Sequence, residues 1–318
     1  MSQDTLLEDW RREEAHPFAG WDFSHLDGRM IQEEHPWSYL TRAAELMQSS
    51  TSVVDLDTGG GERFLSLRPY WPAKVVATEE YPPNCALATE RLTPHGAQVI
   101  SVRLTDDDPM PFADGEFDLV LNRHAAFNPA EVARCLAPEG TFLTQQVHGM
   151  WAWDLLAAFD ARPQWPDATP AKYAPRLEGA GLEIVQVREW EGKLRFTDVG
   201  AIVYYLKAVP WLVPGFSVET HQRYLFALQE QLDACAELAF VARLYLIEAR
   251  KPAAVGAPYW RRELHSFADR VLRSFAVRRD VRGVALGGNL ARGREWRHSD
   301  VEMAILERAG DNNTNLEP

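Results

Sequence analysis

The sequence is poor in cysteine and holds no paired cysteine motif. Its three cysteines, Cys85, Cys135 and Cys235, lie far apart, and no C-x-x-C pair occurs. Zinc sites and dithiol redox sites use closely spaced cysteines, so this spacing argues against both classes. We expect inert thiols in a reducing cytoplasm.

Long apolar runs and positive charge are also scarce. No stretch approaches the ~20 apolar residues of a membrane-spanning helix, and the charged first 18 residues lack an apolar signal region. Lys and Arg number 33 against 46 Asp and Glu, which gives a formal net charge of −13. An acidic surface repels phosphate backbones and so argues against nucleic acid, although a local basic patch can coexist with it. We expect a cytoplasmic protein without a membrane partner that acts on a small molecule; nothing here predicts its oligomeric state.

One stretch, residues 52–92, has the pattern of a strand, a glycine turn, a helix and a second strand. The apolar run 53–56 leads into the turn 57–61 (DTGGG), a helix-like segment follows at 63–67, and a second apolar run covers 74–78. This order predicts a βαβ unit whose ligand-binding end lies at the C-terminal ends of the strands.

The residue types of this unit suit a nucleoside ligand. Glycine lets the backbone approach a ligand closely and adopt positive φ, and free N–H groups at a helix start attract carboxylate or phosphate. An acid at the tip of the second strand, where Glu79 and Glu80 stand, can accept both hydroxyls of a ribose. The dinucleotide pattern G-x-G-x-x-G is absent, which argues against a dinucleotide site.

Strand and helix continue to alternate up to about residue 150. We expect strands at 98–102, 117–121 and 141–147, with a helix at 129–136 before the last of them. This alternation predicts an α/β fold with a right-handed, doubly wound and mostly parallel sheet.

Further along the chain, residues 196–211 (FTDVGAIVYYLKAVPW) form an apolar run, which we interpret as a strand followed by Pro-Trp. Its Tyr204, Tyr205 and Trp211 either line a substrate pocket or belong to an ordinary core.

The glycine stretch resembles motif I of class I S-adenosylmethionine-dependent methyltransferases, written (V/L)-(L/V)-D-x-G-x-G-x-G. Asp55 matches the acid of the motif, Gly59 and Gly61 match its second and third glycines, and Glu79 matches the ribose-binding acid. Asp57 stands where the motif has its first glycine. The resemblance implies S-adenosylmethionine as cofactor and a Rossmann-like, seven-stranded sheet of order 3-2-1-4-5-7-6.

A second stretch, residues 106–121, resembles the D-x-x-x-L-P-F-x-D-x-x-F-D-L-V segment of the same superfamily. There an acid accepts a hydrogen bond from the adenine amino group; Asp106 is the best positional match and Asp107 the second choice. The alternative is a solvated acidic loop. The cofactor-binding set that the resemblance implies is Asp55, Asp57, Thr58, Gly59, Gly60, Gly61, Glu79, Glu80, Asp106, Asp107 and Asn122.

Further segments resemble a bacterial subfamily of these methyltransferases over residues 17–252. They are TGGGE, ATE-x-Y-x-PN, LNRH, TQQV and DVGAIVYYLKAVPW. The subfamily commonly has an acid after its R-H pair, where this sequence has Ala125. This likeness implies the fold and the cofactor but not the methyl acceptor.

Two residues after the fourth expected strand are candidates for catalysis. His124 has the pKa range of a general base, and its alternative is a structural histidine. Asn122 could orient a substrate, but the absence of an N-P-P-Y motif argues against methylation of the adenine amino group. We expect no metal site in this part of the chain.

The last stretch, residues 281–305, resembles the start of the polymerase-β-like nucleotidyltransferase fold. In that fold a glycine turn binds triphosphate and two carboxylates, here Asp300 and Glu302, hold Mg²⁺. Asn289 replaces the serine of the motif, and no strand with a third carboxylate follows. The alternative is a truncated remnant or a small interaction module.

We therefore expect an N-terminal helical and aromatic cap (1–50), a methyltransferase domain (51–252) and a small α+β appendage (259–318). The leading hypothesis is methyl transfer from S-adenosylmethionine to a small-molecule acceptor. The alternatives are an RNA base methyltransferase, a catalytically decayed protein that keeps the fold for binding, and, more distantly, nucleotidyl transfer.

Overall fold

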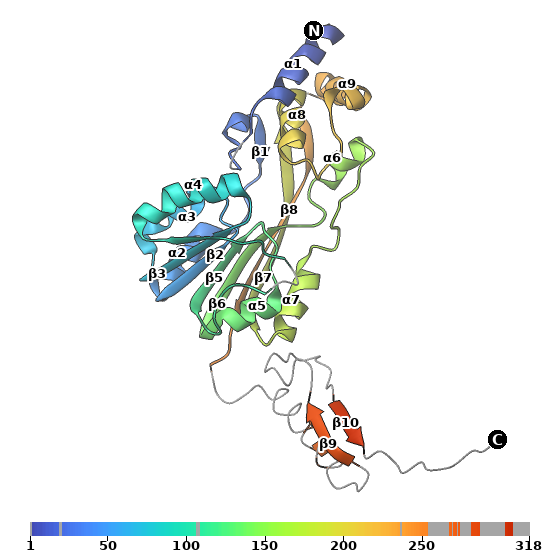
Figure 1. The fold of residues 1–318 in the computed structure, drawn as a ribbon. Coiled ribbons are helices and arrows are strands. Elements are labelled where there is room, and N and C mark those ends of the chain that lie inside the picture. Colours follow the sequence, from blue (N-terminus) through green and yellow to red (C-terminus); the bar gives the residue numbers. More distant parts are fainter. Residues whose placement is uncertain are drawn as a thin grey trace, which may run out of the picture.

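The computed structural model describes residues 2–18, 21–105, 109–235, 237–253, 267–268, 270–271, 273, 281–286 and 303–307. Its centre is an eight-stranded sheet (Figure 1). The strands are β1 (Met30–Gln32), β2 (Ser52–Leu56), β3 (Lys74–Glu79), β4 (Gln98–Ser101), β5 (Phe117–Arg123), β6 (Leu136–Val147), β7 (Glu183–Phe196) and β8 (Leu238–Arg250). The helices are α1 (Gln3–Ala15), α2 (Tyr39–Gln48), α3 (Glu62–Ser66), α4 (Pro82–Leu92), α5 (Pro129–Cys135), α6 (Trp153–Ala158), α7 (Pro170–Gly179), α8 (Val199–Ala208) and α9 (Val218–Cys235).

The order of the sheet is β1-β7-β8-β6-β5-β2-β3-β4. Without β1 this is the expected 3-2-1-4-5-7-6 order, which is confirmed. Strands β2 to β6 pair in parallel, whereas β8 runs antiparallel to β6 and β7. The sheet is mixed but mostly parallel, as expected. The expectation of seven strands was wrong, because β1 adds an eighth strand beside β7.

Helices cover both faces of the parallel part of the sheet (Figure 1). Because side chains alternate along a strand, Val53 faces the cluster that contains α2, α3 and α4. Its neighbour Val54 faces the cluster that contains α5 and α7. The strand ends between these two layers are therefore held from both sides.

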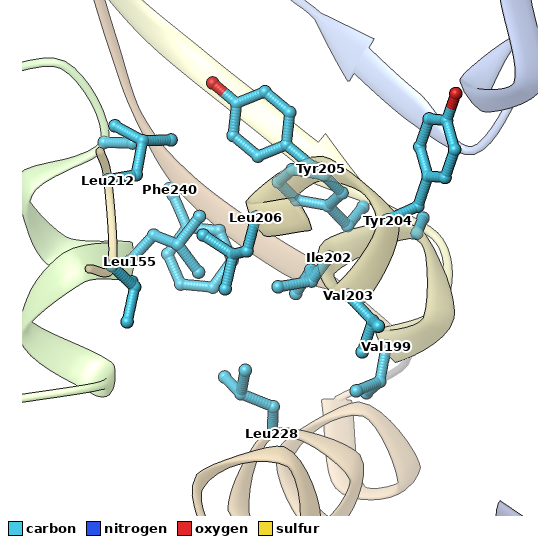
Figure 2. Packing of buried hydrophobic residues seen from close by; sticks show 14 of the residues in the cluster. Leu155, Val199, Ile202, Val203, Tyr204, Tyr205, Leu206, Leu212, Leu228 and Phe240 are labelled. Atoms are coloured by element: carbon cyan, nitrogen blue, oxygen red, sulfur yellow. The ribbon is translucent and has the colours of Figure 1, made fainter. Parts of the chain in front are cut away.

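The apolar run expected to be a strand after residue 196 is instead the helix α8. Asp198 caps it by accepting from the backbone N–H of Ala201 at 2.8 Å. A helix that is apolar on all sides must be buried all round. Figure 2 accordingly shows α8 packed among Leu155 of α6, Leu228 of α9 and Phe240 of β8. Tyr204 and Tyr205 on this helix are buried and belong to the core.

Part of the C-terminal region forms a second, two-stranded sheet. Strands β9 (Val281–Leu286) and β10 (Met303–Glu307) pair antiparallel. Asn289, Asp300 and Glu302 lie outside the described residues, so the resemblance to a nucleotidyltransferase stays a prediction. Throughout the parts of the chain that the structure describes, no helix combines the length and apolarity needed to cross a membrane.

Candidate functional site

The glycine turn leaves the end of β2 and is tied by hydrogen bonds to β3. The backbone N–H of Asp57 donates to Oγ1 of Thr78 at 3.0 Å, and that of Thr58 donates to the carbonyl of Thr78 at 2.8 Å. Gly59 and Gly61 have backbone φ angles of 65° and 82°, values that residues with a Cβ rarely adopt. These contacts explain why the sequence needs glycine at both positions.

Glu79, at the tip of β3, connects this turn to the following loop. One carboxylate oxygen accepts from the backbone N–H of Gly59 and the other from that of Tyr81, both at 2.8 Å. The residue is only 5% exposed. Each carboxylate oxygen has two lone pairs, so Glu79 holds the turn and keeps acceptor capacity for a ligand. Glu80 is exposed and lies 3.6 Å from Arg103.

Two further acids beside the turn have raised pKa values. Burial, followed by the negative charges of Glu79 and Glu80, raises the pKa of Asp57 to about 8. Burial raises the pKa of Asp55 to about 7, against the lowering effects of the Thr58 side chain and, next, of the Arg123 charge. Asp57 also has a φ of 53°, in the left-handed region that suits the glycine it replaces.

Several buried polar atoms around the turn have no partner within the described part of the chain. They are Oδ1 of Asp57, Oγ1 of Thr58 and Oδ1 of Asn84. Buried polar atoms are nearly always hydrogen-bonded in native proteins. These three atoms and the free lone pairs of Glu79 therefore fit a polar ligand such as a nucleoside.

An aromatic ring lies over the glycine turn. A Cβ built on Gly59 would lie 3.4 Å from Cδ1 of Trp21. Trp21 is 48% exposed and makes an edge-on contact with Trp211 at 5.7 Å between ring centroids. The N-terminal segment thus contributes an aromatic wall to this side of the site.

A pocket of about 560 Å³ opens beside the turn, at the C-terminal ends of β5 and β6. Its lining consists of residues 34–40 together with Arg63, Arg123 and Gln145. Tyr39 in this lining is buried, and its hydroxyl has no partner within the described residues. The N-terminal segment therefore forms one wall of the pocket and the sheet forms the other.

The two arginines of the pocket have no partner in the part of the chain that the structure describes. Neither Arg63 nor Arg123 makes a side-chain hydrogen bond or ion pair with any described residue. Burial, and then the positive charge of Arg63, lowers the pKa of Arg123 to about 10, so the Arg123 side chain is still a cation at neutral pH. Glu34, which is exposed, is the only carboxylate among the described residues of the lining.

His124 is held at the end of β5 by Gln145. Oε1 of Gln145 accepts from the Trp37 indole N–H at 2.9 Å, and its Nε2 lies 3.3 Å from Nε2 of His124. His124 is exposed as a residue, yet desolvation of its ring among neighbouring groups, and then the charges of Arg123 and Arg63, lowers its pKa well below the usual value. A neutral imidazole of this kind can accept a proton.

Asn122 lies inside the sheet, not in the pocket lining. It is fully buried, and its Oδ1 accepts from Oγ1 of Thr144 at 2.9 Å and from Nε2 of Gln146 at 2.5 Å. The same Gln146 amide donates to the carbonyl of Ala125 at 2.9 Å. This network fixes the ends of β5 and β6 through Oδ1 of Asn122, whereas its buried Nδ2 has no partner among the described residues.

Three predicted cofactor-binding residues remain, Gly60, Asp106 and Asp107, and the structure describes only the first of them. Gly60 is buried between Glu62 and Arg91, whose side-chain atoms lie within 2.8 Å of a Cβ built on it. Asp106 and Asp107 lie outside the described residues, so their assignment to adenine stays a prediction.

Sequence analysis missed the two pocket arginines and Asn84. Arg63 directly follows the glycine turn and Arg123 separates Asn122 from His124, so both stood beside residues that were singled out. The sequence signal that could have identified the two arginines is their position. In an otherwise acidic chain, one cation stands at a helix start and the other at a strand end.

Residues 54–144 match the family described as methyltransferase domain. A comparison with curated proteins found no match. Similar solved structures include a putative methyltransferase from Bacillus halodurans, with 19% identity, a TM-score of 0.49 and coverage of 67% of this chain and 97% of that one. A functionally unknown protein from Deinococcus radiodurans has 16% identity, a TM-score of 0.49 and coverage of 78% and 98%. An S-adenosylmethionine-dependent methyltransferase from Geobacter sulfurreducens, in complex with S-adenosyl-L-homocysteine, has 14% identity, a TM-score of 0.40 and coverage of 68% and 93%.

The match to the methyltransferase domain spans the glycine turn, Glu79, β5 and β6 as far as Thr144. It supports a class I methyltransferase with S-adenosylmethionine as its cofactor.

Proposed function

We propose that this chain transfers a methyl group from S-adenosylmethionine to a small-molecule acceptor. The observation that carries the proposal is the contact between Glu79 and Gly59, which joins the acid at the tip of β3 to the glycine turn. This arrangement presents two free acceptor positions beside a backbone that a ligand can approach closely. The domain match over residues 54–144 adds support.

In this proposal the residues of the turn hold the cofactor. Glu79 accepts the ribose hydroxyls, the turn 57–61 lies along the methionine part, and Asp106 or Asp107 meets the adenine amino group. The bound cofactor supplies an electrophilic methyl group. Proximity in a shaped pocket provides much of the rate of such a transfer.

The chain's own contribution beyond positioning is a base beside the acceptor pocket. His124 is neutral and lies at the C-terminal end of β5, where open sheets place their chemistry. Nε2 of His124 would take the proton that the acceptor loses on methylation, in exchange for the hydrogen bond from Gln145. S-adenosyl-L-homocysteine would be the leaving group. Asn122 supports this end of the sheet through Thr144 and Gln146.

Calorimetric titration with S-adenosylmethionine and S-adenosyl-L-homocysteine tests the proposal. We expect binding by the native chain and loss of binding in Glu79→Ala, with Glu90→Ala, an exposed change on α4, as the matched control. Equal affinity in Glu79→Ala and the native chain would contradict the assignment of the ribose acid.

One observation favours a second candidate, a protein that keeps the fold without the activity. Asp57 places a carboxylate in a left-handed conformation where the motif has glycine, and its Oδ1 is buried without a partner in the described residues. If the site has decayed, the native chain fails to bind S-adenosyl-L-homocysteine and Asp57→Gly restores binding. Binding by the native chain would reject this candidate.

A further inference from the structure

We propose that the pocket beside the glycine turn binds the negatively charged group of the methyl acceptor, a carboxylate or a phosphate, through Arg63 and Arg123. This inference rests on the proposed methyltransferase function and names the chemical class of its acceptor.

The charge balance of the pocket is the first argument. Among the described residues of the lining there are two guanidinium groups and one carboxylate, that of the exposed Glu34. The carboxylate of Asp55, which interacts with Arg123, does not belong to the lining. The chain as a whole has 46 acidic and 33 basic residues, so a net positive pocket stands out from the rest of the surface. An anion entering it gains attraction from both cations.

The lack of partners is the second argument. Among the described residues neither Arg63 nor Arg123 has a carboxylate or carbonyl to bond with. Desolvation of the partly buried Arg123 is offset only by charge interactions with Tyr39 and Asp55, without a hydrogen bond. Arg42, by contrast, binds Glu248 through two nitrogens at 2.7 and 2.9 Å. An anionic ligand would give Arg123 the partner that Arg42 already has.

The walls of the pocket indicate what the uncharged part of the acceptor is like. Trp37 is fixed by its bond to Gln145, and its ring meets that of His35 at 4.8 Å and 84°. Tyr39 adds a buried hydroxyl without a described partner. Rigid aromatic walls with few polar atoms suit a flat or apolar ligand body.

The anion could in principle belong to the cofactor, which has its own carboxylate. We assign it to the acceptor because the pocket lining includes neither Glu79 nor any residue of the turn 57–61. Two cations also provide more charge than one cofactor carboxylate needs.

The experiment measures, by calorimetry on the full chain, the binding affinity of benzoate, phenyl phosphate and the neutral benzamide. Each titration is run with and without saturating S-adenosyl-L-homocysteine. We expect the two anions to bind and benzamide to bind far more weakly. Arg123→Gln should weaken anion binding about tenfold or more, since each lost contact is a charge-assisted hydrogen bond. Arg63→Gln should weaken it by a smaller factor, and Arg68→Gln, an exposed change outside the pocket, should leave it unchanged.

Arg63 is exposed, so Arg63→Gln tests the proposal even if Arg123→Gln does not fold. Equal binding of benzoate and benzamide would overturn it. Unchanged benzoate binding in Arg63→Gln, or in a folded Arg123→Gln, would also overturn it. Competition between S-adenosyl-L-homocysteine and benzoate would also overturn it, because the arginines would then serve the cofactor. If benzoate binds but S-adenosyl-L-homocysteine does not, the proposed function fails while the anion pocket stands.

Discussion

Glu79 accepts a hydrogen bond from the backbone N–H of Gly59 at 2.8 Å, across the gap between the ends of β2 and β3. The same carboxylate accepts from the backbone N–H of Tyr81 at 2.8 Å. A single side chain thus fixes both loops of the proposed cofactor site before any ligand arrives.

The first prediction concerns the stability that this carboxylate provides. Glu79→Ala should lower the free energy of unfolding by about 1–3 kcal/mol, because two backbone donors lose their acceptor. Urea unfolding of the ligand-free protein measures the change, with Glu90→Ala as the exposed control. Native-like stability in Glu79→Ala would mean that the loops are held by other contacts.

A second prediction follows from the raised pKa of Asp57. Between the ordinary value of 3.8 and about 8, the folded protein binds more protons at this site than the unfolded chain. Its free energy of unfolding therefore falls as pH rises through this window. Asp57→Asn cannot ionise, so the decline from pH 4 to pH 8 should become shallower, with the part due to Asp55 remaining.

Thermal or urea unfolding at several pH values measures this slope. Asp27→Asn removes an exposed carboxylate and should keep the native slope. An equally steep decline in Asp57→Asn and the native chain would show that Asp57 does not carry the effect.

The third prediction assigns Asn122 a positioning role. Asn122→Ala removes the acceptor of Thr144 and Gln146 inside the sheet, so it should lower the free energy of unfolding by about 1–3 kcal/mol. Gln3→Ala, an exposed change at the start of α1, serves as control in the same urea series. Full native stability in Asn122→Ala would contradict the positioning role and favour a substrate contact instead.

The fourth prediction concerns the charge of His124. Desolvation, and then the charges of Arg123 and Arg63, holds its pKa well below the usual 6.5, and Nε2 faces the amide nitrogen of Gln145. The imidazole should therefore stay neutral through pH 6.5, with its proton on Nδ1. Proton–carbon NMR spectra of the histidines during a pH titration test this, and His124→Asn identifies the signal. A midpoint at or above 6.5 for that signal would contradict the neutral base.

The order of seven strands was predictable through the resemblance to class I methyltransferases. Five of these strands could also be predicted from the sequence itself, because each is a short run bounded by turn residues. The eighth strand, β1, was not predicted because it has only three residues and no apolar alternation. Its place is fixed by backbone pairing with β7, from Met30 opposite Phe196 to Gln32 opposite Leu194. Such pairing depends on tertiary position and leaves no periodic signal.

The error over α8 has a similar physical cause. Nine of its ten residues are buried, Lys207 being the exception. A fully buried helix has no polar face, so its sequence cannot be told from a buried strand by periodicity. The cap at Asp198 was the one local sign of a helix start.

The site was predictable where a local motif fixes it and not where distant residues converge. The turn 57–61 and Glu79 follow from spacing along one βαβ unit. The pocket needs Arg63 from α3, Arg123 from β5 and the segment 34–40, which only the folded chain brings together.

Hydrogen exchange with and without S-adenosyl-L-homocysteine tests most directly whether the glycine turn and Glu79 form the cofactor site. The amides of Gly59 and Tyr81 both donate to Glu79, so segments that contain residues 57–61 and 79–84 should exchange more slowly when the ligand is bound. This protection should disappear in Glu79→Ala. Binding without protection of either segment, or protection confined to other parts of the chain, would contradict the account.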